Sequence, residues 1–160
     1  QQRLFEMVGL GALKYFILKV DPKKTMLFDP KESIDFNGNT GPFIQYTHAR
    51  IKSVLRKAAE QQLQAALTHA ALNEKEISLL KLLHAFPEKI REAGEALSPA
   101  LIANYTYELS KEFNQYYHEA PVLKEPDVAL KAQRLLLLQQ VAAVLKTAMN
   151  ILGVGVPERM

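Results

Sequence analysis

Cysteine is absent from this chain, and its absence limits the kinds of site that the protein can hold. Without cysteine there is no disulfide framework and no thiolate metal site, a composition that is typical of cytosolic proteins. The four histidines are scattered, and no two have the spacing of a metal-binding motif such as HExxH. We therefore expect no metal site in this chain, and we expect a cytoplasmic protein.

Motifs of common catalytic chemistry are also missing from the sequence. No serine sits in a GxSxG turn, so acyl chemistry has no support, and the glycines between Asn37 and Gly41 lack the lysine of a phosphate-binding loop. There is no signal peptide and no apolar run of the roughly 20 residues that would span a bilayer. The densest apolar patch, Leu135–Leu138, is flanked by polar side chains. We expect a buried helix there and no membrane partner.

What the chain does contain is the composition of an ordinary globular domain. Its 160 residues are 48% hydrophobic and 23% charged, which is enough for one domain with its own core. The formal net charge of +3 permits a polyanionic partner without requiring one. The chain begins at Gln1 rather than at methionine, so we expect a piece of a longer protein whose natural end is Met160.

Helical periodicity dominates the sequence. Apolar side chains recur every three or four residues, and cap residues precede the runs, either Thr40 or Asn39 for one helix and Asn73 for another. Prolines and glycines in residues 21–41 predict an irregular connection. The predicted fold class is all-α, an antiparallel bundle of five to six helices with an irregular N-terminal arm. The predicted helices are residues 2–19, 42–66, 74–84, 87–93, 99–117 and 127–152.

One column of side chains on the predicted helix 42–66 indicates a contact with nucleic acid. Tyr46, Arg50, Ser53 and Lys57 follow one another at spacings of four, three and four residues, on a face apart from the apolar stripe. An aromatic ring can stack on a base, and a neighbouring cation can hold a phosphate. The same column is also compatible with an ordinary solvated basic face, and spacing alone leaves both interpretations open.

A second candidate surface lies near the end of the predicted helix 99–117. Tyr107, Lys111, Asn114 and His118 form one polar column. Tyr117 ends this helix and faces a loop that contains prolines, where its ring could stack on an unpaired base. Both helices therefore offer aromatic and polar groups of the kind that bind single-stranded RNA.

Four stretches of the sequence together resemble one family, the class I arginyl-tRNA synthetases. The run VGLGALKYFIL (Val8–Leu18) looks like the helix after the active-site loop of those enzymes, and Thr25–Ala58 looks like their junction into a DALR-type anticodon-binding domain. The run YELSKEFNQYYHEAPVL (Tyr107–Leu123) matches further along, and ILGVGVPERM (Ile151–Met160) resembles the usual chain end. The resemblance covers essentially the whole chain, in order.

The resemblance implies a division of the chain that composition could not reveal. Residues 1–38 would be the end of the catalytic core with its irregular connection, and residues 39–160 the helical anticodon-binding domain of an arginine–tRNA ligase. The family's HIGH-like and KMSKS-like catalytic signatures would precede this chain, and neither occurs in it. The chain would then hold no catalytic residue and no cofactor, with ATP, Mg and arginine bound upstream.

The resemblance also assigns RNA contacts. The positions resembling Tyr117 and Met160 approach the anticodon loop in the family, and the one resembling Tyr46 faces RNA. Some members carry an aromatic residue where this chain has Pro121, so the stacking group here would be Tyr117, His118 or the proline face. The full candidate set is Tyr46, Arg50, Lys57, Asn114, Tyr117, His118 and Met160.

Other aromatic and basic side chains have different predicted roles. Tyr105 and Tyr116 follow the apolar side of their helix and are predicted to lie in the core. Arg134 lies among leucines on the last helix, and the sequence leaves three roles open for it: contact with RNA, extension of its charged group to solvent, or pairing with an acid. His84 is expected to pack or to act as a cation at a helix end.

The expected partners are tRNA(Arg) and the catalytic domain of the same polypeptide, in a monomer. The alternative is a helical protein-interaction module whose basic columns only keep it soluble. The two functions differ in a measurable way, because RNA binding weakens steeply with salt and prefers one tRNA, whereas docking of a protein does neither.

Overall fold

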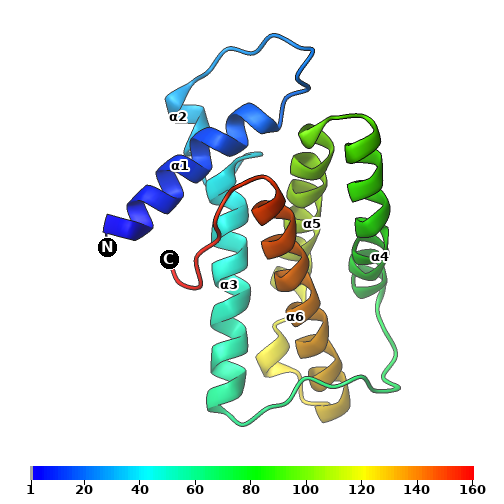
Figure 1. The fold of residues 1–160 in the computed structure, drawn as a ribbon. Helices are drawn as coiled ribbons and strands as arrows, with labels where there is room; N and C mark the ends of the chain where they lie inside the picture. The colour runs from blue at the N-terminus through cyan, green and yellow to red at the C-terminus, as the bar shows by residue number, and fades with distance from the viewer. Residues whose placement is uncertain (1) are drawn as a thin grey trace.

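Six α-helices and one short 3₁₀ turn make up the regular structure of residues 2–160, which the computed structural model describes (Figure 1). No strand occurs in this range, so the predicted all-α class is confirmed. The elements are α1 (Gln2–Leu18), α2 (Pro30–Ser33), α3 (Gly41–Glu60), α4 (Glu74–Glu95), α5 (Pro99–Glu119), η1 (Val122–Lys124) and α6 (Val128–Ile151).

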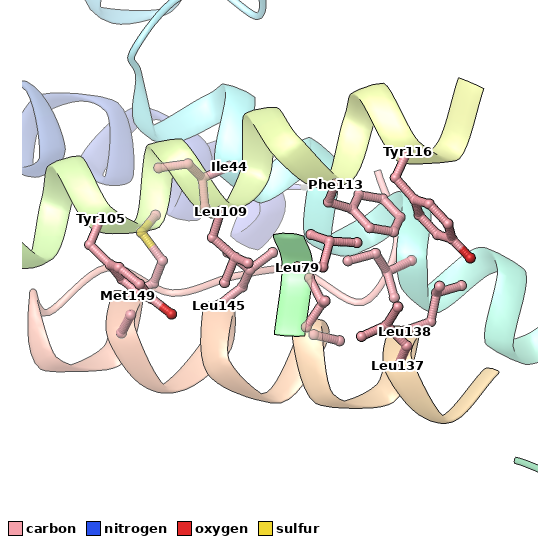
Figure 2. Close-up of a cluster of buried hydrophobic side chains, with 14 of the residues drawn as sticks. Ile44, Leu79, Tyr105, Leu109, Phe113, Tyr116, Leu137, Leu138, Leu145 and Met149 are labelled. Carbon is pink, nitrogen blue, oxygen red and sulfur yellow. The ribbon is translucent and has the colours of Figure 1, made fainter. Parts of the chain in front are cut away.

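Four of these helices, α3 to α6, stand side by side and alternate in direction, while α1 crosses one end of the bundle against α3 (Figure 1). The core lies between all four helices, and α5 and α6 supply most of its buried side chains. Figure 2 shows Leu109 and Phe113 of α5 meeting Leu138 and Leu145 of α6, all of them buried. Each such side chain contributes about 1.5–3 kcal/mol of hydrophobic stabilisation.

The last helix, α6, is long and apolar enough by length and composition to cross a membrane. In the bundle, its leucines and Val141 instead pack against the other helices, and Met149 is fully buried. The predicted buried helix is therefore found, although its apolar window is longer than the sequence reading allowed. Tyr105 and Tyr116 also lie in the core, as predicted, with exposed fractions of 6% and 0%.

Helix α3 ends at Glu60, six residues before the predicted end at Ala66. Gln62 adopts a positive φ of 58°, and the amide of Leu63 donates to the carbonyl of Ala58 at 2.9 Å. This bond closes the helix in the manner of a Schellman motif, although glycine is the usual residue at the positive-φ position. The following residues, 63–73, form a connection that contacts α6, where the amide of Ala66 donates to the carbonyl of Ala132 at 3.1 Å and the Thr68 hydroxyl donates to Gln133 at 2.8 Å.

Helix α4 passes through Pro87 without a break, so the prediction of two helices, 74–84 and 87–93, was wrong. A proline inside a helix removes one hydrogen bond and costs about 3 kcal/mol. Packing on α5 offsets this cost, because Phe86 stacks on Tyr105 at 5.5 Å and the Tyr105 hydroxyl donates to the carbonyl of Leu82 at 2.8 Å. His84 therefore lies inside the helix, exposed, and not at a helix end.

The connection between α1 and α3 is irregular, as predicted, apart from α2. Asp29 caps this single turn by accepting from the amide of Lys31 at 2.8 Å. Glycine at position 41 allows α1 to approach α3 closely, because a side chain there would meet the carbonyl oxygen of Gly11 at 2.7 Å. This contact fixes α3 against α1 at the end where the candidate site begins.

Candidate nucleic-acid interface

The start of α3 fixes which of its side chains face outward. Thr40 caps the helix by accepting from the amide of Phe43 at 3.2 Å, and Pro42 occupies the first turn, where a missing N–H costs nothing. Ile44 and Ile51 point into the core and are fully buried. The opposite face is left to the predicted column, in which Tyr46 is 42% exposed.

Arg50 lies between two tyrosine rings. Its guanidinium carbon is 4.8 Å from the centroid of the Tyr46 ring on the same helix and 5.5 Å from that of Tyr117 on α5. Each cation–π contact of this kind is worth about 0.5–1 kcal/mol at a partly exposed site. The salt bridges within residues 2–160 include none to Arg50, so the rings hold its charge without neutralising it.

Asn114 orients Arg50 from α5. The guanidinium donates to the side-chain oxygen of Asn114, whose amide donates in turn to the Thr47 hydroxyl and to the Ser110 carbonyl, both at 2.8 Å. With its oxygen and its amide both engaged, Asn114 positions Arg50 and has little capacity left for a ligand. The predicted residue is thus at the surface in question, but it acts by holding its neighbour.

Two hollows open on either side of the Tyr46–Arg50 pair. The larger has a volume of about 620 Å³, and its lining includes Lys57, Tyr117, Arg159 and Met160. The smaller has a volume of about 340 Å³, and its lining includes Asn114 and His118 together with Phe36 and Phe43. Tyr46 and Arg50 line both. We call the larger hollow the α3 groove. Together the two hollows gather every residue of the candidate set.

Positive charge dominates the α3 groove. Arg50, Arg56, Lys57 and Arg159 line it, against a single carboxylate side chain, that of Glu60. A groove with cations along one wall and tyrosine rings at its edge is suited to an anionic chain that carries flat, stackable groups.

The C-terminal tail, residues 153–160, forms one border of this groove. The chain leaves α6 through Gly153, whose φ of +69° suits glycine, and returns along α3 (Figure 1). Gln45 donates to the carbonyl of Gly155 at 2.7 Å, and His48 Nδ1 donates to that of Pro157 at 2.9 Å. Met160, which is 43% exposed, thereby reaches the lining of the groove.

Gln45 and His48 were missed by sequence reasoning. Both are polar residues on the buried side of α3, with exposed fractions of 0% and 1%. A polar pair next to an apolar stripe signals a buried partner, but sequence alone does not say that the partner lies more than a hundred residues away. Burial lowers the pKa of His48 below its ordinary value, opposed by the hydrogen bond to Pro157 and the charge of Glu158.

Tyr117 is half-buried rather than freely exposed. One face of its ring stacks on Phe113 at 5.9 Å, and the cation of Arg50 lies over the ring. Its ring edge also meets His118 at 6.3 Å. The tyrosine is therefore rigidly held beside the groove, and only part of its ring is available to a ligand.

Two other residues of the predicted column on α5 serve elsewhere. Tyr107 packs on Phe43 at 5.6 Å, and Lys111 pairs with Glu108 at 2.6 Å. Pro121 lines a separate hollow together with Tyr116.

Arg134 pairs with acids, which confirms one of the alternatives that the sequence left open. Its guanidinium reaches Glu76 at 2.6 Å and Glu125 at 2.6 Å, and the Glu76 side chain is 0% exposed. Burial opposes the charge of Arg134, but the hydrogen bond and charge of Glu76 raise its pKa above the ordinary value. In the part of the chain that the structure describes, no three histidine, aspartate or glutamate side chains gather as metal ligands.

Comparison with known families supports the sequence resemblance. The profile of the DALR anticodon binding domain matches residues 44–160. A protein from Parabacteroides distasonis named arginine–tRNA ligase is 56% identical, over 99% of this chain and 27% of its own length. The protein of the same name from Bacteroides thetaiotaomicron is 56% identical, over 96% of this chain and 26% of its own. The chain thus spans about a quarter of the length of these relatives.

Solved structures agree with the observed fold. Arginyl-tRNA synthetase from Thermus thermophilus superposes with a TM-score of 0.85 at 35% sequence identity, over 96% of this chain and 27% of that one. The synthetase from Plasmodium falciparum gives a TM-score of 0.84 at 26% identity, over 99% of this chain and 28% of that one. The bundle, the crossing helix α1 and the returning tail are therefore parts of one shared architecture.

Proposed function

The chain belongs to the family of DALR anticodon-binding domains, and we propose that it binds the anticodon loop of tRNA(Arg) as part of an arginine–tRNA ligase. One observation carries this proposal. Arg50 has no carboxylate partner within residues 2–160, and it is held between the rings of Tyr46 and Tyr117 at the edge of a groove whose charged side chains are mainly cations. Rings and charge of this kind suit the splayed bases and phosphates of a single-stranded loop.

Each part of the surface has a proposed role. A base of the loop stacks on the open part of Tyr46 or Tyr117, which is worth about 1–3 kcal/mol per base. Arg50 and Lys57 hold phosphates, and a guanidinium also presents paired donors to the edge of a base. Met160 offers an apolar contact at the far border, and His118 lines the neighbouring hollow. Asn114 contributes by orienting Arg50.

The rest of the proposed ligase accounts for the exposed face of α1. Phe5, Leu10 and Ile17 are 72%, 57% and 50% exposed, more apolar surface than one solvated helix usually presents. We infer that the catalytic domain of the same polypeptide covers this face. In that arrangement, residues 1–38 connect the two parts, and residues 39–160 are the unit that meets the anticodon loop.

Catalysis is then assigned to the other part of the polypeptide. ATP with Mg and arginine bind there, and this chain positions the tRNA so that its 3′ end reaches them. We further infer a cytoplasmic monomer without membrane contact, in which α6 serves as the core helix of the bundle.

The test uses the full-length protein and two RNAs, tRNA(Arg) and the same tRNA with a foreign anticodon. We expect the foreign anticodon to weaken binding at constant salt, and we expect both affinities to fall steeply as salt rises. Equal affinity for the two RNAs would overturn recognition of the anticodon. Weak binding of both, with little dependence on salt, would favour the alternative of a protein-interaction module.

A further inference from the structure

Two buried polar side chains on α3 hydrogen-bond to the returning tail. Gln45 and His48 are one turn apart, and neither is exposed to solvent by more than 1%. Burying a polar group without a hydrogen bond costs roughly 1–3 kcal/mol in proteins, so a pair at this depth requires partners. The tail supplies a backbone carbonyl to each, Gly155 at 2.7 Å from Gln45 and Pro157 at 2.9 Å from His48, and Gln45 also donates to the carbonyl of Met7 on α1 at 3.2 Å.

The geometry of the tail suits this pairing. In an extended segment, alternate carbonyls point to the same side, and Gly155 and Pro157 are two residues apart. A carbonyl oxygen only accepts hydrogen bonds, so Nδ1 of His48 must carry the proton that Pro157 receives. His48 is therefore a donor of fixed tautomer, and asparagine can supply an amide N–H at nearly the same place.

Further contacts extend the attachment as far as Glu158. Arg56 donates to the carbonyl of Glu158 at 2.7 Å, and Lys52 pairs with the Glu158 side chain at 3.0 Å. On the other side, a side chain at Gly155 would meet Met7 of α1 at 3.3 Å. The tail is thus held from both sides up to Glu158, and the two residues beyond it line the α3 groove.

We propose that Gln45 and His48 are positioning residues of the anticodon-binding site. They contact no RNA themselves; they fix the C-terminal tail so that Arg159 and Met160 close one border of the groove. This proposal rests on the proposed function, and it explains why polar groups occupy a part of α3 that apolar packing could have filled. It makes the last two residues of the chain an ordered part of the site, although chain ends ordinarily fray.

The experiment is a double-mutant cycle in the full-length protein, with kcat and KM measured separately for tRNA(Arg) and for arginine. The changes are His48→Ala, deletion of Arg159 and Met160, and both together. We expect His48→Ala to raise the KM for tRNA roughly five- to tenfold, the size of one lost hydrogen bond, and to leave the KM for arginine unchanged. In the truncated protein, the same substitution should have no further effect, because the residues that it positions are gone.

A conservative variant separates positioning from folding. His48→Asn keeps the donor to Pro157, so we expect a KM for tRNA within about twofold of the original. Gln45→Leu, which fills the space without a donor, should behave like His48→Ala. If His48→Ala lowers the melting temperature so far that its kinetics cannot be measured, His48→Asn and Gln45→Leu are compared instead. The proposal then requires that Gln45→Leu raise the KM for tRNA without changing the KM for arginine, and that His48→Asn change neither.

Several outcomes would overturn the proposal, and they differ from a failure of the proposed function. Equal effects of His48→Ala in the full and truncated proteins would show that His48 does not act through the tail. A matching loss for arginine would show a merely structural role. If Arg50→Ala also leaves the affinity for tRNA unchanged, the site itself is misassigned; if only Arg50→Ala weakens it, the site stands and the role of His48 falls.

Discussion

Arg50 and Arg134 are both half-buried arginines next to consecutive tyrosines of α5, yet their surroundings give them opposite uses. Arg134 lies near Tyr116 and forms ion pairs with Glu76 and Glu125. Arg50 lies over Tyr117 and is held by the neutral side chain of Asn114. The difference teaches that sequence context on one helix does not make an arginine available to a ligand. What decides is whether carboxylates from other helices neutralise it.

The largest effect that would test this contrast is on stability. Arg134→Ala leaves the carboxylate of Glu76 buried without its partner, and breaking a buried ion pair in this way costs about 3–5 kcal/mol. Arg50→Ala removes a partly exposed side chain, and we expect it to cost less than about 1 kcal/mol of stability. Urea unfolding of the 160-residue chain measures both, with Arg134→Ala combined with Glu76→Gln as the control.

The combined variant distinguishes the cause. If the buried charge is responsible, Glu76→Gln should restore part of the stability lost in Arg134→Ala. A double variant that is no more stable than Arg134→Ala alone would instead point to lost packing of the arginine stem.

The next effect concerns binding of tRNA by the full-length protein. Arg50→Ala with Lys57→Ala removes two cations from the groove, and we expect the slope of log affinity against log salt to fall by about one unit for each lost phosphate contact. The matched control is Lys81→Ala with Lys124→Ala, which removes the same charge from exposed positions outside the groove. Equal slopes in the two double variants would mean that the groove attracts RNA only through net charge.

A smaller effect is expected for Tyr117→Ala. The lost stack on a base should weaken tRNA binding by about 1–3 kcal/mol. Because the ring also packs on Phe113, stability will fall, and the affinity must be compared at equal folded fraction. Tyr117→Phe is the control, since it keeps the ring. A fall in stability with no change in affinity would place Tyr117 in the core and leave Tyr46 as the stacking residue.

Local signals in the sequence were sufficient for much of the fold. The caps at Thr40 and Asn73 are made as predicted, since each depends on residues within four positions. Events that depend on distant packing were not accessible. Helix α4 continues through Pro87 because α5 packs against it there, and α3 ends at Glu60 with Gln62, rather than a glycine, at the positive-φ position. In both cases, tertiary contacts overrode local preference.

The candidate site divides in the same way. The column of Tyr46, Arg50 and Lys57 depends only on helical periodicity, and the groove contains all three. Whether Arg50 or Arg134 lacks an acidic partner could not be predicted, because the decisive carboxylates come from other helices. The attachment of the tail by His48 was inaccessible for the same reason, since Pro157 is 109 residues away.

The smallest expected effect is a dependence of stability on pH that separates the groove border from the rest of the bundle. Burial lowers the pKa of His48, partly opposed by Pro157 and Glu158, while Lys52 and Lys146 lower it further. The unfolded chain therefore binds a proton at His48 more readily than the folded chain does. It follows that the stabilisation is fully present above the unfolded pKa of about 6.5 and declines as pH falls below that value toward the folded pKa.

Unfolding of the 160-residue chain and of His48→Asn between pH 7.5 and 5 measures this effect, because asparagine does not titrate. Glu158, whose pKa is held below its ordinary value despite partial burial mainly by Lys52, stays charged over this window, and the other histidines are common to both proteins. We expect the stability of the original chain relative to His48→Asn to decrease as pH falls. A constant difference would mean that His48 is not buried as a neutral donor to Pro157, and the border of the groove would then lack the fixed attachment that distinguishes it from an ordinary chain end.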